Sequence, residues 1–269
     1  QGIKISISGP DWTSLPPCEP SKIDFDQYLG AFDIHSYFGI TPEVNGERII
    51  KDWVLFAASK NKPFFISEIG NMKLGWGADN PGPKSFKAAL SNASDIVQCM
   101  NLGVDGFNRW SFVNRGDLDG QWQLVNTYER KTKTYNKEVI PENEAYYGFA
   151  MLTRFLGKYA AVISCKSDLN PEGLFTTAYN NRDGSITVLI VNNRKESVIA
   201  DLTIKNAHEK QVFYLYQVTD LMVKDVDCKV NPQRTYESND GLRSIKIFPQ
   251  SITVLTTNLL KSSDAGVIN

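Results

Sequence analysis

The sequence predicts a mixed fold, in which a parallel α/β part is followed by an all-β part. Up to about residue 112, short apolar strands alternate with segments whose apolar residues recur at helix-face spacing. This alternation is typical of βαβ units with right-handed crossovers. Beyond about residue 160, short runs alternate between apolar and polar residues and are separated by turn residues, which favours an antiparallel β-sandwich.

The α/β part is expected to contain four strands, at residues 3–8, 31–37, 62–68 and 104–112. Helices are expected where apolar residues return every three or four positions, at residues 47–59, 84–100 and 143–156. Gly103 follows the second of these helices and suits the left-handed backbone position at which helices commonly end.

Six further strands are expected in the all-β part, at residues 174–179, 186–191, 198–204, 211–216, 244–248 and 252–257. The first two are joined by Asn181-Arg182-Asp183-Gly184. An Asp-Gly pair readily adopts the positive φ angles of a tight hairpin, so these two strands are expected to be antiparallel neighbours.

Composition excludes several classes of protein. The 269 residues carry a net charge of −1 without a basic patch, which argues against a nucleic-acid partner. No apolar run approaches the roughly 18 residues of a membrane span. Nothing at Gln1 resembles a signal peptide, although a mature chain would have lost one.

The cysteines and histidines indicate no metal site, because the cysteines form no CxxC pair and the two histidines lie far apart in sequence. No cofactor is expected. Four free thiols and one or two disulfides fit the cysteine count equally well, so the redox compartment stays open. The cysteines are Cys18, Cys99, Cys165 and Cys228.

Glu68 is the most informative residue. It closes an apolar strand that starts near Lys62 and is followed at once by Ile69-Gly70-Asn71. In parallel α/β folds the carboxyl ends of strands carry the chemistry, because loops converge there while the strand holds the side chain. Glu68 is therefore a catalytic candidate by its position.

The order of these strand ends resembles a known group of enzymes. A strand ending in Ser67-Glu68, preceded by one that carries His35 and Tyr37 and followed by one that ends near Trp110, resembles strands six to eight of the clan A retaining glycoside hydrolases. These enzymes are (β/α)8 (TIM) barrels. The all-β part, with its Asp183-Gly184 hairpin and closing strand, resembles the β-sandwich attached to the barrels of families 30, 39 and 51.

The resemblance implies a domain organisation. Residues 1–158 would form the C-terminal half of a TIM barrel with strands five to eight, residues 159–262 a β-sandwich, and residues 263–269 a flexible tail. It also implies hydrolysis of a β-linked poly- or oligosaccharide by retaining double displacement, without a cofactor or metal, in a secreted or periplasmic protein.

The resemblance also assigns roles to residues. Glu68 would be the nucleophile, Tyr37 would orient it, and His35 would line the same pocket. The side chains that would contact the sugar are Trp110, Trp12, Trp76 and Asn108. In retaining enzymes the two catalytic carboxyl groups are about 5–5.5 Å apart, which makes a covalent intermediate possible.

Simpler interpretations stand beside these roles. Glu68 could cap the next helix or pair with an arginine, His35 and Tyr37 could be packed core residues, and the tryptophans could be ordinary packing aromatics. Residues 114–120 have a hint of a calcium loop but lack the spaced acidic ligands of a full motif.

One component of the implied active site is expected from outside this chain. The resemblance starts at strand five, whereas the acid of these enzymes belongs to an Asn-Glu pair on strand four. The acidic residues Asp11, Asp33, Glu43 and Glu47 lie in or after the wrong strands. An N-terminal half-barrel in the same parent protein or in a second chain would supply the acid; alternatively, the chain is a non-catalytic carbohydrate-binding or scaffold protein derived from such an enzyme.

Overall fold

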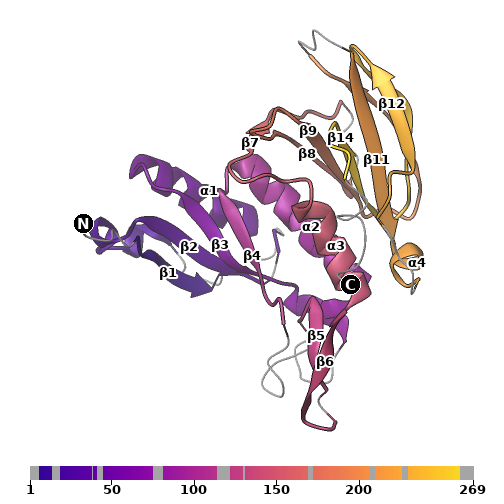
Figure 1. The fold of residues 1–269 in the computed structure, drawn as a ribbon. Coiled ribbons are helices and arrows are strands. Elements are labelled where there is room, and N and C mark those ends of the chain that lie inside the picture. The colour runs from indigo at the N-terminus through magenta and orange to yellow at the C-terminus, as the bar shows by residue number, and fades with distance from the viewer. Residues whose placement is uncertain are drawn as a thin grey trace.

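The fold was analysed in a computed structural model. It describes residues 6–13, 19–37, 39–40, 45–74, 81–113, 122–129, 131–168, 172–205, 210–225 and 230–260. In these segments a parallel sheet lies on one side of a layer of helices and a larger antiparallel sheet lies on the other side (Figure 1).

The parallel sheet has four strands in the order β1-β2-β3-β4. They are β1 (Ser8–Thr13), β2 (Ala31–Ser36), β3 (Phe64–Ile69) and β4 (Gly106–Arg109). Helix α1 (Gly46–Ser59) connects β2 to β3, and helix α2 (Phe86–Leu102) connects β3 to β4. The expectation of four neighbouring parallel strands with intervening helices is confirmed.

The first and fourth strands of the parallel sheet differ most from the expected bounds. The first strand was expected at residues 3–8, but β1 begins at Ser8, and residues 1–5 lie outside the described segments. The fourth strand was expected to reach Phe112, but β4 ends at Arg109. After it, the N–H of Ser111 donates to the carbonyl oxygen of Trp122 (3.2 Å), so the chain leaves the parallel ladder there.

Both helices cover the same face of the parallel sheet. Phe32 and Ile34 of β2 and Phe64 of β3 are buried there against α1, where the ring of Trp53 stacks on that of Phe64 with centroids 5.8 Å apart. Alternation along a strand places Asp33 and His35 on the opposite face. His35 therefore lies on the side of the sheet away from α1 and α2.

Helix α2 has clear stop and start signals. The hydroxyl of Ser85 accepts a hydrogen bond from the N–H of Ala88 (3.3 Å), which satisfies one of the free donors at the helix start. Gly103 follows the last turn with φ +99°, as the sequence predicted. Helix α3 (Asn143–Thr153) packs beside α2, and it ends three residues earlier than expected.

The antiparallel part contains a six-stranded sheet and a two-stranded sheet. The six strands, in spatial order, are β12 (Arg234–Ser238), β11 (Gln211–Thr219), β14 (Ser251–Thr256), β9 (Ile186–Asn192), β8 (Leu174–Asn180) and β7 (Ala161–Ile163). The pair is β10 (Val198–Thr203) with β13 (Gly241–Ile247), and the short helix α4 (Asp220–Val223) follows β11.

The six expected strands of this part are present, and two more were not predicted. Strand β7 has three residues, all exposed, and β12 is largely polar and exposed, so neither carries the apolar alternation by which strands are recognised. The hairpin after Asn180 forms as expected, with β8 and β9 antiparallel.

The six-stranded sheet is buried on both faces. On one face, Ile190 and Leu255 pack with Ile245 of the two-stranded sheet. On the other, Leu189 and Val254 belong to the same core as the helices α2 and α3. The core of the α/β part therefore continues without interruption into the antiparallel part.

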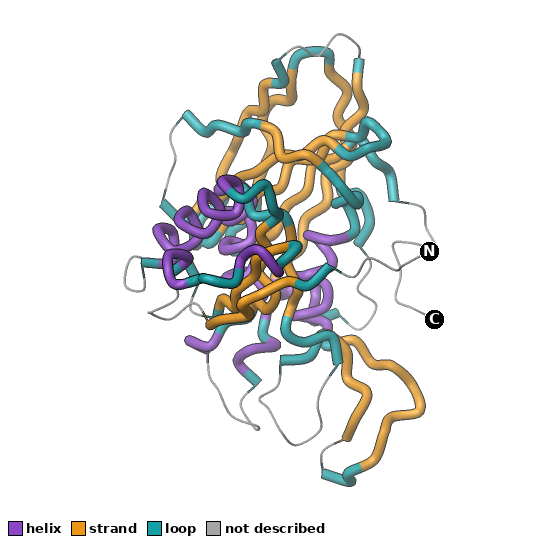
Figure 2. Tube along the Cα trace, turned by 90° about the vertical axis from the view of Figure 1, so that its left-hand side faces the viewer, coloured by secondary structure: helices purple, strands orange, loops and turns teal. Residues whose placement is uncertain are grey.

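A hairpin that the sequence did not predict lies between β4 and α3. It consists of β5 (Val125–Glu129) and β6 (Thr134–Pro141) and projects from the body of the molecule (Figure 2). Most of β6 is exposed, including Tyr135, so burial imposes no alternating pattern on its sequence.

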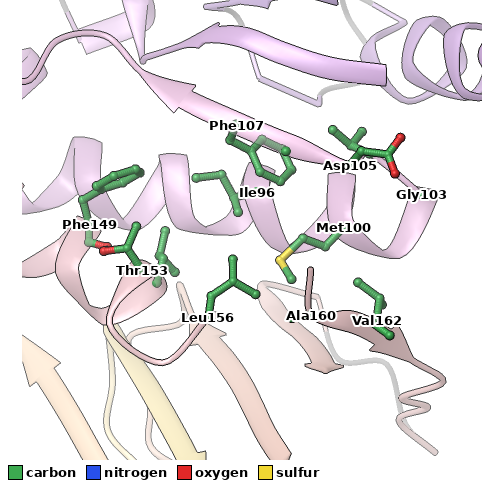
Figure 3. Close-up of a pocket in the computed structure, with 14 residues that line it drawn as sticks. Ile96, Met100, Gly103, Asp105, Phe107, Phe149, Thr153, Leu156, Ala160 and Val162 are labelled. Carbon is green, nitrogen blue, oxygen red and sulfur yellow. The ribbon is translucent and has the colours of Figure 1, made fainter. Parts of the chain in front are cut away.

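An apolar pocket of about 370 Å³ lies between β4, α2 and α3 (Figure 3). Phe107, Ile96 and Phe149 line it, together with Leu156 and Val162. Phe107 belongs to the helix-covered side of β4, so this pocket is separate from the face that carries His35. Among the described helices, none is long and apolar enough to cross a membrane.

Candidate active site

Glu68 lies at the carboxyl end of β3, where its side chain meets side chains from the neighbouring strands. The pairing of β2 with β3 sets His35 opposite Glu68, after an irregularity between Ile34 and His35. The hydroxyl of Tyr37, just beyond the end of β2, donates a hydrogen bond to Glu68 Oε2. The predicted contact between Tyr37 and Glu68 is therefore present.

His35 contacts the same carboxylate oxygen. Its Nδ1 lies 3.2 Å from Glu68 Oε2, and its Nε2 lies 2.7 Å from Asp11 Oδ1. The ring stands edge-on to that of Tyr37, with centroids 6.2 Å apart. Glu68, Tyr37 and His35 thus form one cluster, and Asp11 of β1 joins it through the imidazole.

Trp122 supports this cluster, and the sequence did not single it out. Its fully buried ring meets that of Tyr37 edge-on, with centroids 5.6 Å apart. A Cβ atom on Gly70 would lie 2.8 Å from Cζ3 of Trp122 and 3.0 Å from Cε1 of Tyr37. Only glycine lets both rings approach the backbone just after Glu68. Trp122 lies in no regular element, so its sequence gave no periodic signal.

Arg109 is a second residue that the sequence did not indicate. Its guanidinium group is buried, and burial lowers the pKa of Arg109 to about 10, so it remains charged at neutral pH. Tyr37 lies close enough to act on the pKa of Arg109 in the opposite direction. Nη2 donates to the carbonyl oxygen of Pro83 (3.3 Å), which ties β4 to the segment before α2.

Two of the expected sugar-binding residues lie beside the cluster. The backbone N–H of Trp110 donates to the carbonyl oxygen of Ile69 (3.1 Å), so Trp110 is next to the residue that follows Glu68. Asn108 is exposed, and because Phe107 faces the helices, Asn108 faces the opposite side of the sheet. The backbone of Trp110 and the side of β4 that carries Asn108 therefore lie near the strand end that carries Glu68.

Trp12 does not join them. It pairs in register with Ile34, whose side chain faces the helices, and its ring meets that of Trp53 edge-on at a centroid distance of 6.3 Å. The expectation that Trp12 extends an aromatic surface next to Glu68 is wrong, because the irregularity in β1 between Pro10 and Trp12 moves Trp12 to the other face of the sheet. Trp76 lies outside the described residues.

Two of the four cysteines lie within the described segments, and neither is among the described contacts of this cluster. Cys99 and Cys165 are free thiols, and burial raises the pKa of Cys99. Cys18, Cys228 and residues 114–120 lie outside the described segments. Within the described segments, no group of three or more His, Cys, Asp or Glu side chains is arranged to hold a metal ion.

The cluster can orient a carboxylate for attack. Oε2 of Glu68 accepts the hydrogen bond from the Tyr37 hydroxyl and lies next to Nδ1 of His35. Within the described residues, Oε1 of Glu68 accepts no hydrogen bond. The Glu68 side chain is one-quarter exposed. The described contacts of Glu68 include no second carboxyl group, so the arrangement contains a possible nucleophile without a possible acid next to it.

Comparison with known proteins shows what this fold is similar to. No protein family and no curated protein matches the chain by sequence. Solved structures do match its fold, and they include a glycoside hydrolase family 30 subfamily 8 xylanase from Clostridium acetobutylicum. That xylanase is 14% identical, with a TM-score of 0.54, over 86% of this chain and 49% of the xylanase chain.

Two further matches are similar in extent. A 4-O-α-L-rhamnosyl-β-D-glucuronidase from Fusarium oxysporum 12S is 15% identical, with a TM-score of 0.56, over 85% of this chain and 53% of its own. A family 51 arabinofuranosidase from Xanthomonas axonopodis pv. citri is 12% identical, with a TM-score of 0.52, over 87% of this chain and 53% of its own. The chain therefore shares the fold of about half of each of these clan A-type glycoside hydrolases.

Proposed function

We propose that this chain is the nucleophile-bearing part of a retaining glycoside hydrolase that acts on a β-linked poly- or oligosaccharide. The observation that carries this proposal is the position of Glu68, a carboxylate at the carboxyl end of a parallel strand that Tyr37 and His35 contact on one oxygen. The fold shared with xylanases and other glycoside hydrolases supports it.

In this mechanism Glu68 attacks the anomeric carbon and forms a glycosyl ester, which water then hydrolyses. Tyr37 and His35 hold the carboxylate so that its other oxygen faces the sugar. Trp110 offers a ring on which the sugar can stack, and Asn108 and Trp76 are further candidates for hydrogen bonding and stacking.

The acid that protonates the leaving oxygen comes from a second half of the barrel. In this proposal residues 1–158 are the C-terminal half of a TIM barrel and residues 159–262 are the attached β-sandwich. Two observations support it. Among the described strands, β1 and β4 each have a free edge, which is a template for pairing with another strand, and the chain spans about half the length of the structures it matches.

The same proposal implies where the protein acts. A polysaccharide too large to enter a cell has to be hydrolysed outside the cytoplasm, so we place the protein among secreted or periplasmic proteins.

A second candidate function is carbohydrate binding without catalysis. It is favoured by one observation, that the described contacts of Glu68 include no second carboxyl group. A binding or scaffold protein derived from a glycosidase would keep the face of the parallel sheet that carries His35 and need no acid.

The test is complementation. The 269-residue chain alone is expected to show no appreciable turnover of an unactivated glycoside, because general acid catalysis commonly contributes about 10²- to 10⁴-fold. Activity is expected when a polypeptide that carries the N-terminal half-barrel is added. Glu68→Gln is expected to abolish that activity, because an amide of nearly the same shape cannot form the glycosyl ester.

Glu138→Gln is the matched control, since Glu138 is exposed on β6 and the charge change is the same. A 2-deoxy-2-fluoroglycoside should label Glu68 covalently in the active assembly, which peptide mass spectrometry detects. Hydrolysis by the chain alone that survives Glu68→Gln would exclude Glu68 as the nucleophile, and binding without hydrolysis or labelling in the assembly would favour the second candidate.

A further inference from the structure

We infer that Asp11 is a positioning residue for Glu68, which it influences through the imidazole ring of His35. This inference rests on the proposed function, because it takes Glu68 as the nucleophile. It concerns a residue that lies on β1, two strands away from β3, and that makes no direct contact with Glu68 among the described interactions.

The backbone around Asp11 is shaped to present its side chain. The register of β1 against β2 shifts between Pro10 and Trp12, so Asp11 is the extra residue of a bulge. Its φ of +60° lies in the left-handed region, which Asp and Asn tolerate better than most residues. Its N–H donates to Oδ1 of the buried Asp33 (2.9 Å). Bulges of this kind redirect a side chain at a sheet edge.

The side chain of Asp11 then closes a three-residue chain of contacts. Asp11 Oδ1 lies 2.7 Å from Nε2 of His35 and also accepts a hydrogen bond from the Ser67 hydroxyl at 3.0 Å. The opposite ring nitrogen, Nδ1, lies 3.2 Å from Glu68 Oε2. Both edges of the imidazole therefore face carboxylate oxygens, and the ring cannot rotate without losing one of them.

These distances indicate an effect on orientation rather than on folding. The Asp11 side chain is 66% exposed, so its contact with His35 is open to solvent and contributes little to stability. The ring of His35 is mostly buried, at 16% exposure, and its orientation decides whether a nitrogen faces Glu68. The ionisable groups in the described contacts of this site are Asp11 from β1, Asp33 from β2, Tyr37 just beyond the end of β2, and Glu68 from β3.

The first experiment measures His35 directly and needs no enzyme activity. The chain has two histidines, so ¹⁵N–¹H ring correlations are simple, and a His208→Gln variant leaves only the His35 signals. Asp11→Ala is expected to change the ring signals of His35, because Nε2 loses its partner. Asp24→Asn, an exposed aspartate in the connection between β1 and β2, is expected to leave them unchanged.

The second experiment measures turnover in the assembly of this chain with the N-terminal half-barrel. Asp11→Ala is expected to lower kcat by about 10- to 100-fold with little change in KM, because misplacement of a reacting group mainly reduces the rate of the chemical step. Asp11→Asn keeps an oxygen that can accept from His35 and a residue suited to the left-handed backbone, so it is expected to retain most of kcat.

The outcomes separate this inference from the proposed function. If Glu68→Gln abolishes activity while Asp11→Ala has the kcat of the wild type, the inference is wrong and the proposed function stands. Unchanged His35 ring signals in Asp11→Ala would also overturn it, as would an Asp11→Asn variant as slow as Asp11→Ala, since charge rather than position would then matter. An assembly in which Glu68→Gln has no effect would overturn both.

Discussion

At the scale of single residues, Gly39 and Ile40, which follow β2, lie against a buried carboxyl group on α2. Oδ1 of Asp95 accepts a hydrogen bond from the N–H of Ile40 (3.2 Å). Gly39 has φ +74°, and a Cβ atom there would lie 2.9 Å from Asp95 Oδ2. Burial raises the pKa of Asp95 to about 6, against the opposing effects of the Ile40 N–H and of Lys73. Gly39 and Ile40 are therefore held by a carboxyl group whose pKa is about 6.

Asp95→Asn is expected to make the protein less sensitive to pH. Because the folded state raises the pKa of Asp95 from 3.8 to about 6, its stabilising contribution is complete below about pH 4 and is lost as the pH rises through about 6. Asparagine stays neutral and keeps the acceptor for Ile40. Urea unfolding should show the variant to be more stable at pH 7, by up to about 3 kcal/mol, and similar to the wild type near pH 4.

Asp24→Asn serves as the control for this measurement, because Asp24 is exposed. Parallel stability curves for the wild type and Asp95→Asn between about pH 4 and pH 7 would contradict the assigned role of Asp95.

At the scale of elements, helices α2 and α3 approach each other unusually closely at one point. A Cβ atom on Gly148 of α3 would lie 2.4 Å from the Cβ atom of Ala89 on α2. Gly148 and Ala89 are both buried. If position 148 carried an alanine, neither its methyl group nor that of Ala89 could move aside by side-chain rotation. This contact sets the spacing of the helix layer that joins the parallel sheet to the six-stranded sheet.

Gly148→Ala is therefore expected to destabilise the protein, although alanine is the better helix former by about 1 kcal/mol. Overpacking of this kind typically costs about 1–3 kcal/mol, which exceeds that gain. The free energy of unfolding, measured with urea, should fall in Gly148→Ala.

The matched test is the double variant Gly148→Ala/Ala89→Gly, which moves one methyl group from α2 to α3. It should be more stable than Gly148→Ala alone, because the clash is removed. A Gly148→Ala variant more stable than the wild type would show that the helices can separate without cost.

At the scale of the whole molecule, one core spans the parallel sheet, the helices and the six-stranded sheet. Phe64 of β3, Val97 of α2 and Leu189 of β9 all belong to it. Such a shared core couples the two parts, so they are expected to unfold in one transition rather than as separate units.

Leu189→Ala tests this coupling, since the five tryptophans lie at positions 12, 53, 76, 110 and 122, all before the expected domain boundary. Truncation of a buried leucine typically costs about 2–5 kcal/mol. Tryptophan fluorescence should therefore report a lower Tm even though the change is in β9. Ile199→Ala on β10, where the side chain is 64% exposed, should leave Tm unchanged. If the Tm measured by tryptophan fluorescence were the same in Leu189→Ala as in the wild type, the two parts would unfold independently.

The sequence alone determined the alternation of strands and helices, because periods of two and of about 3.6 residues follow from which face each element buries. It also located Glu68 at a strand end and predicted its contact with Tyr37, since the carboxyl ends of neighbouring parallel strands meet. The sequence did not predict strands with little burial, such as the largely exposed β6 and β12.

Tertiary structure alone decided how side chains near Glu68 are distributed between the two faces of the sheet. The bulge at Asp11 turns Trp12 toward Trp53 of α1 and turns Asp11 toward His35. A shift of one residue exchanges the faces of a strand, and it depends on backbone contacts with a neighbouring strand, here the N–H of Asp11 with Asp33. Such contacts join residues far apart in sequence, so no local pattern encodes them.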